Sequence, residues 1–230
     1  MGFVVSFQEE EAYPLALEEY VSICGFKPES EKHQKMLAAG MKIREAGIGG
    51  INIRALLSLY DPEVIHEGGM EINGVKLRCD SLFWLDKEKI RRIILYIMTV
   101  NECTCDSEDI LDMVYADFWG TAYAGAAFKR LRAELNARYV DGIECLALSE
   151  AYGPGYYGMP TGEMKNFFSI LDGEKIGVRC MPSCIMLPVK SCVGMFFIME
   201  KGAKSPESYC KDCAGNPSGC RLCGLRNRIQ

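Results

Sequence analysis

The amino-acid sequence predicts an α+β protein that ends in a small four-cysteine metal site. Three observations lead to this fold class. Two segments near the N-terminus have the apolar spacing of helices, several later segments have the composition of strands, and two Cys-x-x-Cys pairs lie near the C-terminus. We expect one core over residues 1–202, in which the segment 1–85 contains helices and a hairpin, and a metal-binding tail over 203–230.

The composition excludes several classes of protein. The chain has 230 residues and a formal net charge of -5, which disfavours a nucleic-acid binder that works by neutralising phosphates. No apolar run reaches the roughly eighteen residues that a membrane span needs. The first residues have no basic region of the kind that begins a signal peptide. We therefore expect a cytoplasmic protein, in which the 12 cysteines are free thiols or metal ligands.

The N-terminal segment is expected to contain two helices and one hairpin. Residues 8–24 have a helical pattern entered near Pro14, and residues 29–46 form a second helical pattern that ends at Gly47. Apolar and polar residues alternate over 70–77 on both sides of an Asn-Gly pair. Because Asn-Gly tolerates the positive φ angles of a type I′ turn, this segment predicts a β-hairpin.

A buried strand and a long helix are expected in the middle of the chain. Residues 93–100 are rich in β-branched and aromatic side chains, which favours a strand. The helical pattern begins at Asp106-Ser107, and its apolar face starts with Ile110, Val114 and Phe118. The small residues over 120–127 would let another backbone approach this helix closely.

The C-terminal half of the core is expected to add strands and a short helix. Residues 144–149 are a plausible strand, and Thr161 can cap a helix over 162–171. The segments 176–181 and 191–199 have strand composition, and we expect them to pair with each other.

The cysteine tail is the sharpest local motif. Each Cys-x-x-Cys turn places two thiolates on one side, so two turns supply the four ligands of a tetrahedral site. Both zinc and a [4Fe-4S] cluster accept this ligand set, and two disulfides or free thiols are the other interpretation. Six basic and three acidic side chains over 200–230 give this end a charge of +3. A solvated end explains that charge better than contact with nucleic acid. The expected metal ligands are Cys210, Cys213, Cys220 and Cys223.

A glycine-rich loop lies between the expected strand 144–149 and the helix 162–171. Gly153-Pro154-Gly155-Tyr156 would let a ligand approach the backbone, and the helix N-terminus offers N–H groups to an anion. Any tight connection has a similar composition, so this loop does not define a site by itself.

Three motifs resemble the activation (AdoMet-binding) domain of cobalamin-dependent methionine synthase, particularly its small stand-alone bacterial relatives. They are Gly153–Gly158, which is similar to the family's Pro-Gly-Tyr loop, Ile176–Ser191, and Asp117–Ala122. The resemblance covers about residues 90–199. It implies a bent central antiparallel sheet flanked by helices, and the presentation of S-adenosylmethionine to an oxidised corrinoid.

The resemblance also implies which residues bind S-adenosylmethionine. Ala151 stands where the family has an arginine that can pair with the ligand's carboxylate. From the residues alone, the two loop tyrosines could equally stack on a purine or pack over the sheet. Lys190 could equally meet an anionic group or be a surface lysine, and Asp117 fits a half-exposed helix carboxylate better than a ligand contact. No residue has a catalytic acid–base pattern. The implied binding residues are Asp117, Gly153, Pro154, Gly155, Tyr156, Tyr157, Ser183, Lys190 and Ser191.

Two functions follow as hypotheses. The first is an accessory protein for the reductive activation of a corrinoid- or cobalamin-dependent methyltransferase, with a corrinoid protein or methionine synthase as partner. An iron–sulfur cluster in the tail could supply the reducing electron. The second is a non-enzymatic metal-binding interaction module that has kept the fold and lost the ligand.

Overall fold

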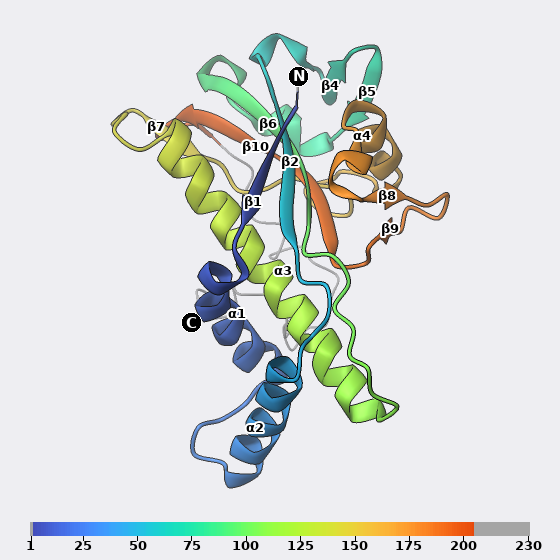
Figure 1. Ribbon diagram of the computed structural model, residues 1–230. Coiled ribbons are helices and arrows are strands. Elements are labelled where there is room, and N and C mark those ends of the chain that lie inside the picture. The colour runs from blue at the N-terminus through green and yellow to red at the C-terminus, as the bar shows by residue number, and fades with distance from the viewer. Residues whose placement is uncertain (1, 205–230) are drawn as a thin grey trace.

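The computed structural model describes residues 2–204 and has the α+β architecture that the sequence predicts (Figure 1). A curled antiparallel sheet has the strand order β1-β2-β6-β10-β7. A β-bulge between Ile198 and Met199 shifts the register of β10 against β6, and bulges of this kind increase the local bend and twist of a strand. The strands of this sheet are β1 (Phe3–Phe7), β2 (Ile53–Tyr60), β6 (Ile90–Thr99), β7 (Leu146–Leu148) and β10 (Ser191–Glu200).

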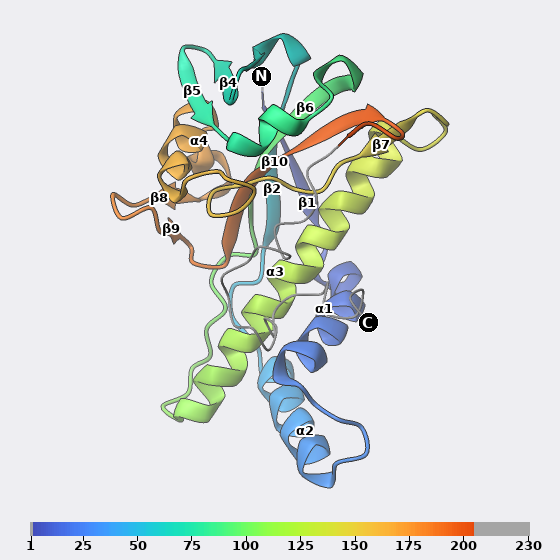
Figure 2. The same cartoon turned by 180° about the vertical axis from the view of Figure 1, so that it is seen from behind.

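Three helices form the layer on one face of the sheet. The long helix α3 (Ile110–Tyr139) crosses this face, α1 (Glu9–Cys24) lies against α3, and α2 (Glu31–Glu45) follows at one end (Figures 1 and 2). The small residues of α3 have the expected effect, because a Cβ atom on Gly125 would lie 3.3 Å from the Glu19 side chain of α1. The close approach lets Trp119 of α3 stack on Tyr20 with ring centroids 4.1 Å apart.

The other face carries short strands and one short helix. These are β3 (Ile65–His66), β4 (Gly69–Ile72), β5 (Val75–Arg78), α4 (Met164–Ile170), β8 (Arg179–Cys180) and β9 (Met186–Leu187). The hairpin expected over 70–77 is confirmed, since β4 pairs with β5 and both turn residues, Asn73 and Gly74, have positive φ. Side chains of β4, β5 and α4 cover a second core on this face of the sheet.

Most expected elements are confirmed, including the first two helices. The strands expected over 93–100, 144–149 and 191–199 correspond to β6, β7 and β10, although β6 begins three residues earlier, at Ile90. The pairing of 176–181 with 191–199 is wrong. Gly177 has φ +72, which interrupts an extended strand, and β8 pairs with β9 instead of β10. Ile176 and Val178 are apolar because they pack on the sheet face. The sequence analysis also missed β1 and β2, which form one edge of the sheet.

Two expected helix starts also differ from the structure. Helix α3 begins at Ile110 and not at Asp106-Ser107, because the Asp109 side chain accepts a hydrogen bond from the Leu111 amide at 2.8 Å. Thr161 caps no helix, since it starts a short 3-10 turn that precedes α4 and makes no capping hydrogen bond.

Candidate functional site

Several of the expected binding residues lie together where β10 meets α3. Lys190 precedes β10, and its Nζ atom lies 2.7 Å from Asp117 Oδ1 and donates to Thr121 Oγ1 at 2.9 Å. Asp117 and Thr121 are four residues apart on α3, so both side chains leave the helix on one face. Gly120 makes room for the lysine, because a Cβ atom there would lie 3.0 Å from Lys190 Cε.

The glycine-rich loop follows the edge of β10. Tyr152 exchanges two backbone hydrogen bonds with Met195, of 2.9 and 2.8 Å, which extends the sheet edge beyond β7. Gly153 lies directly against this strand, since a Cβ atom would be 2.8 Å from the Val193 carbonyl oxygen and 2.6 Å from the Tyr156 hydroxyl. Glycine is therefore needed here for packing inside the protein.

Tyr156 places its hydroxyl inside the protein and part of its ring at the surface. The side chain is 41% exposed, yet its hydroxyl is hydrogen-bonded to that of Tyr96. Burial of the hydroxyl raises the pKa of Tyr156 to about 12, with Cys192 as a further cause. The phenol thus stays neutral at physiological pH, and the ring offers an apolar surface to a ligand.

We call Asp117, Thr121, Tyr156 and Lys190 the β10-edge cluster. Lys190 and Cys192 are two residues apart, which corresponds to about 7 Å along an extended chain. The Tyr156 hydroxyl and the Val193 carbonyl oxygen lie 2.6 and 2.8 Å from the same point, the Cβ position of Gly153, so the loop and the lysine approach the same stretch of the sheet edge. The sheet edge therefore brings together residues that are up to 73 positions apart in the sequence, as 190 minus 117 shows.

The other expected binding residues have different positions. Tyr157 is buried against Tyr152, with ring centroids 4.6 Å apart, and belongs to the core. Gly155 is exposed and Pro154 is half-buried. Ser191 Oγ bonds to the Pro188 carbonyl at 2.7 Å and to Thr99 Oγ1 at 2.9 Å. Ser183 lies in the exposed turn between β8 and β9, and no described contact joins it to the cluster.

Arg132 is a candidate that the sequence analysis missed. Its guanidinium donates to the Ser149 carbonyl at 2.9 Å, lies 6.0 Å from the centre of the Phe196 ring, and approaches Glu150 at 3.5 Å. The cation thus lies beside the backbone that leads into Ala151. The sequence offered one signal for Arg132, which is its helical spacing of four residues from Phe128. In the structure both side chains contact Phe196.

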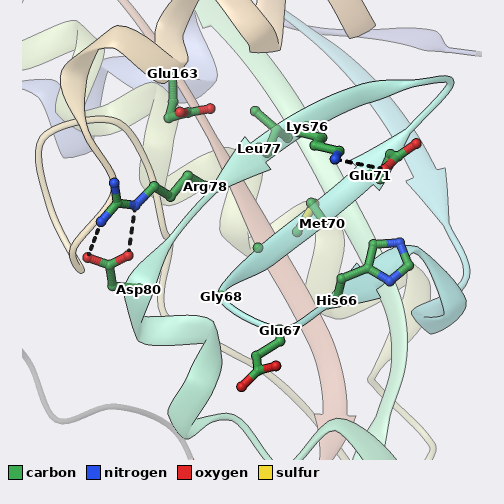
Figure 3. A pocket seen from close by; sticks show the side chains of 11 residues that line it. His66, Glu67, Gly68, Met70, Glu71, Lys76, Leu77, Arg78, Asp80 and Glu163 are labelled. Carbon is green, nitrogen blue, oxygen red and sulfur yellow. Dashed lines mark hydrogen bonds and ion pairs between the residues drawn. The ribbon is translucent and has the colours of Figure 1, made fainter.

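The hollow shown in Figure 3 lies elsewhere, between the β3–β5 strands and the turn that precedes α4. Its volume is about 620 Å³, and it is lined by ion pairs between Arg78 and Asp80 and between Lys76 and Glu71. None of the expected S-adenosylmethionine residues lines it.

The four tail cysteines, Cys210, Cys213, Cys220 and Cys223, lie outside the described residues, so their role as metal ligands stays a prediction. Within residues 2–204, no group of three or more His, Cys, Asp or Glu side chains is arranged to hold a metal ion. No helix in this range has the length and apolarity that crossing a bilayer requires.

Comparison with known proteins defines the fold class. No family model matches the sequence, and no curated protein matches it either. Among solved structures, the fold matches that of the MetH reactivation domain bound to AdoHcy, with a TM-score of 0.57 and 13% sequence identity. The match covers 90% of this chain and 81% of that domain. The chain therefore has the fold of the methionine synthase reactivation domain, as the resemblance implied.

Proposed function

We propose that this protein binds S-adenosylmethionine along β10, between Arg132 and Tyr156, and assists the reductive activation of a corrinoid-dependent methyltransferase. The observation that carries this proposal is the fold match over 90% of the chain to a reactivation domain that binds AdoHcy. The proposed partner is a corrinoid protein or a cobalamin-dependent methionine synthase. The proposed location is the cytoplasm. The eight described cysteines are all free, in keeping with a reducing compartment.

The side chains at the sheet edge suit the chemistry of this ligand. S-adenosylmethionine carries a carboxylate, two cationic groups and a purine. Arg132 would take the carboxylate in place of the family arginine, whose position is Ala151 here. Asp117 lies 15 residues before Arg132 on α3 (132 minus 117), which is about 22 Å along the helix, so it would not reach the amino-acid end of the ligand. Glu150, whose carboxylate is 3.5 Å from the Arg132 guanidinium, would face the ammonium group beside the ligand's carboxylate. The exposed part of the Tyr156 ring would stack on the purine.

When bound, S-adenosylmethionine supplies a methyl group. The residues of this chain would hold and orient it so that the partner's cobalt can approach, which contributes through proximity and needs no acid–base group. In this proposal the ligand supplies the methyl group and the protein only positions it, so the chain needs no catalytic acid or base.

Ligand binding tests the proposal directly. AdoHcy titrated into the purified full chain should raise its melting temperature, because a ligand at 100 times its Kd stabilises the native state by about 2.7 kcal/mol. Arg132→Gln removes the proposed carboxylate partner and should weaken binding about tenfold or more, a loss of roughly 1.4 kcal/mol, as calorimetry would measure.

Ser183→Ala is the matched control for this titration. Ser183 is exposed in the β8–β9 turn, so its substitution should leave both the affinity for AdoHcy and the melting temperature unchanged. No shift of the unmodified chain at millimolar AdoHcy or S-adenosylmethionine would contradict the proposal. Equal losses in both variants would contradict the assignment of the site to the β10 edge.

A second function is supported by the packing of the loop. The Tyr156 hydroxyl occupies the space beside Gly153, so the loop is well packed without a ligand. We infer, as the alternative, an interaction module that keeps the fold and binds zinc or a [4Fe-4S] cluster through the tail cysteines. The absorption spectrum of anaerobically purified protein separates the two metals, because only the cluster has visible charge-transfer bands. Removal of the metal by a chelator should abolish partner binding. It should leave the melting temperature of the core, residues 2–204, unchanged.

A further inference from the structure

The β8–β9 hairpin carries two cysteines at its turn. Met181 donates its amide hydrogen to the Ile185 carbonyl at 2.8 Å, and Cys184 donates to the Met181 carbonyl at 2.9 Å. The second bond closes a β-turn, whose end residues have Cα atoms less than about 7 Å apart. Cys184 is therefore held next to Met181, and Cys180 is the residue directly before it.

The thiols of Cys180 and Cys184 are neighbours at this turn. Burial is the main cause that raises the pKa of Cys180, and the neighbouring Cys184 is the second cause, whereas Lys165 lowers it. Both side chains are partly exposed. The hairpin projects from the body of the molecule (Figures 1 and 2), and Ile185 beside the pair is 53% exposed. Reagents in solution can therefore reach this pair.

Burial raises the pKa of three other described thiols further than that of Cys180. Cys79 is buried, and burial raises its pKa to about 11. Burial also raises the pKa of Cys103 to about 11 and that of Cys192 to about 12. Thiols with such pKa values are poor nucleophiles at neutral pH. Cys145 is exposed but lies in the segment before β7, away from the hairpin.

We propose that Cys180 and Cys184 form a reversible dithiol–disulfide pair that reacts with low-molecular-weight disulfides such as glutathione disulfide. The thiolate of one cysteine attacks a sulfur of glutathione disulfide, forms a mixed disulfide and releases one glutathione. The second cysteine then attacks the protein sulfur of the mixed disulfide and releases the other glutathione. The hairpin loses two electrons and two protons, and glutathione disulfide is reduced to two glutathione molecules.

The oxidised hairpin has a structural consequence. A disulfide holds the Cα atoms of its cysteines about 4.4–6.8 Å apart, so the bond would lock the β8–β9 turn. After β9 the chain runs through Pro188 directly to Lys190, so the turn lies close in sequence to the β10-edge cluster. The pair itself does not depend on the function proposed for that cluster.

Peptide mapping of the full chain tests the inference. The reduced protein is equilibrated with defined mixtures of glutathione and glutathione disulfide, quenched, and alkylated. The peptide with Cys180 and Cys184 should lose two hydrogens, carry no glutathione and resist alkylation at both positions. Cys145 should carry glutathione or remain open to alkylation. The inference is wrong if both hairpin thiols are alkylated as readily as Cys145, or if each carries its own glutathione.

A single variant identifies the partner of Cys180. In Cys184→Ser the second attack is impossible, so Cys180 should stop at the mixed disulfide and retain one glutathione. Loss of two hydrogens in this variant would show that Cys180 pairs with a different cysteine and would overturn the inference. The measurement on the unmodified chain remains decisive if the variant folds poorly.

Discussion

At the scale of single residues, the site region depends on glycines that let the loop and the sheet edge touch. Gly194 of β10 faces Tyr152, because a Cβ atom at Gly194 would lie 2.5 Å from the Tyr152 carbonyl oxygen and 2.8 Å from the Tyr96 hydroxyl. A shift of the Tyr152 carbonyl would break its hydrogen bond with the Met195 amide, and a shift of the Tyr96 hydroxyl would break its hydrogen bond with Tyr156. A methyl group at this position should therefore disturb the loop and the strand together.

Gly194→Ala tests this close approach. Overpacking of this kind should lower the free energy of unfolding by about 1–3 kcal/mol, as urea denaturation would measure. Gly162→Ala is the control, because no atom lies within 4 Å of a Cβ there, and its effect should be below about 0.5 kcal/mol. Equal stabilities of the two variants would refute the packing explanation.

At the scale of elements, the first turns of α3 show that apolar residues at helical spacing need not form a buried face. The first turns of the helix contain Ile110 and Val114, which are 75% and 39% exposed although their spacing predicts a buried face. The face that is buried runs through Trp119, Tyr123 and Leu131. The N-terminal end of α3 extends past the sheet in Figure 1, which agrees with the exposure of Ile110 and Val114.

The cap of α3 can be tested with two aspartates. Asp109→Ala removes the side-chain acceptor for the Leu111 amide and should cost about 1 kcal/mol of stability. Asp106→Ala changes an exposed residue before the helix and should alter the stability by less than about 0.5 kcal/mol. Thermal unfolding followed by circular dichroism would measure both, and the reverse order would place the helix start at Asp106.

At the scale of the whole molecule, one sheet separates two cores. Phe196 of β10 packs with the helices, whereas its neighbour Met195 packs with the hairpin and α4. Consecutive residues of a strand point to opposite faces, so one strand takes part in both cores. We expect the two cores to unfold together, because neither has a sheet of its own.

Substitutions on the two faces of β10 test this coupling. Phe196→Ala and Met195→Ala should each destabilise the protein, by about 3–5 and 2–5 kcal/mol respectively. Both variants are made on a Trp84→Phe background, which leaves Trp119 of the helical face as the one tryptophan of the chain. The urea midpoints from far-UV circular dichroism and from tryptophan fluorescence should then coincide. Separate midpoints in Met195→Ala would mean that the two faces unfold independently.

The predictions from sequence succeeded where a few neighbouring residues form the structure. The Asn73-Gly74 turn and the two N-terminal helices were found because their hydrogen bonds close within a few positions. The resemblance to the activation domain correctly implied the bent sheet. The same local methods misjudged 176–181, whose apolar residues cover a sheet and form no strand of it.

The sequence by itself thus determined the α+β class, most element positions and the four-cysteine motif. Only the tertiary structure decided which strands pair, that Lys190 meets Asp117, that Arg132 lies beside Ala151, and that Ser183 stands apart. The physical reason is the range of the interactions. A turn or a cap satisfies its own hydrogen bonds locally, whereas strand order and ion pairs between distant residues depend on how all buried surfaces of the chain fit together.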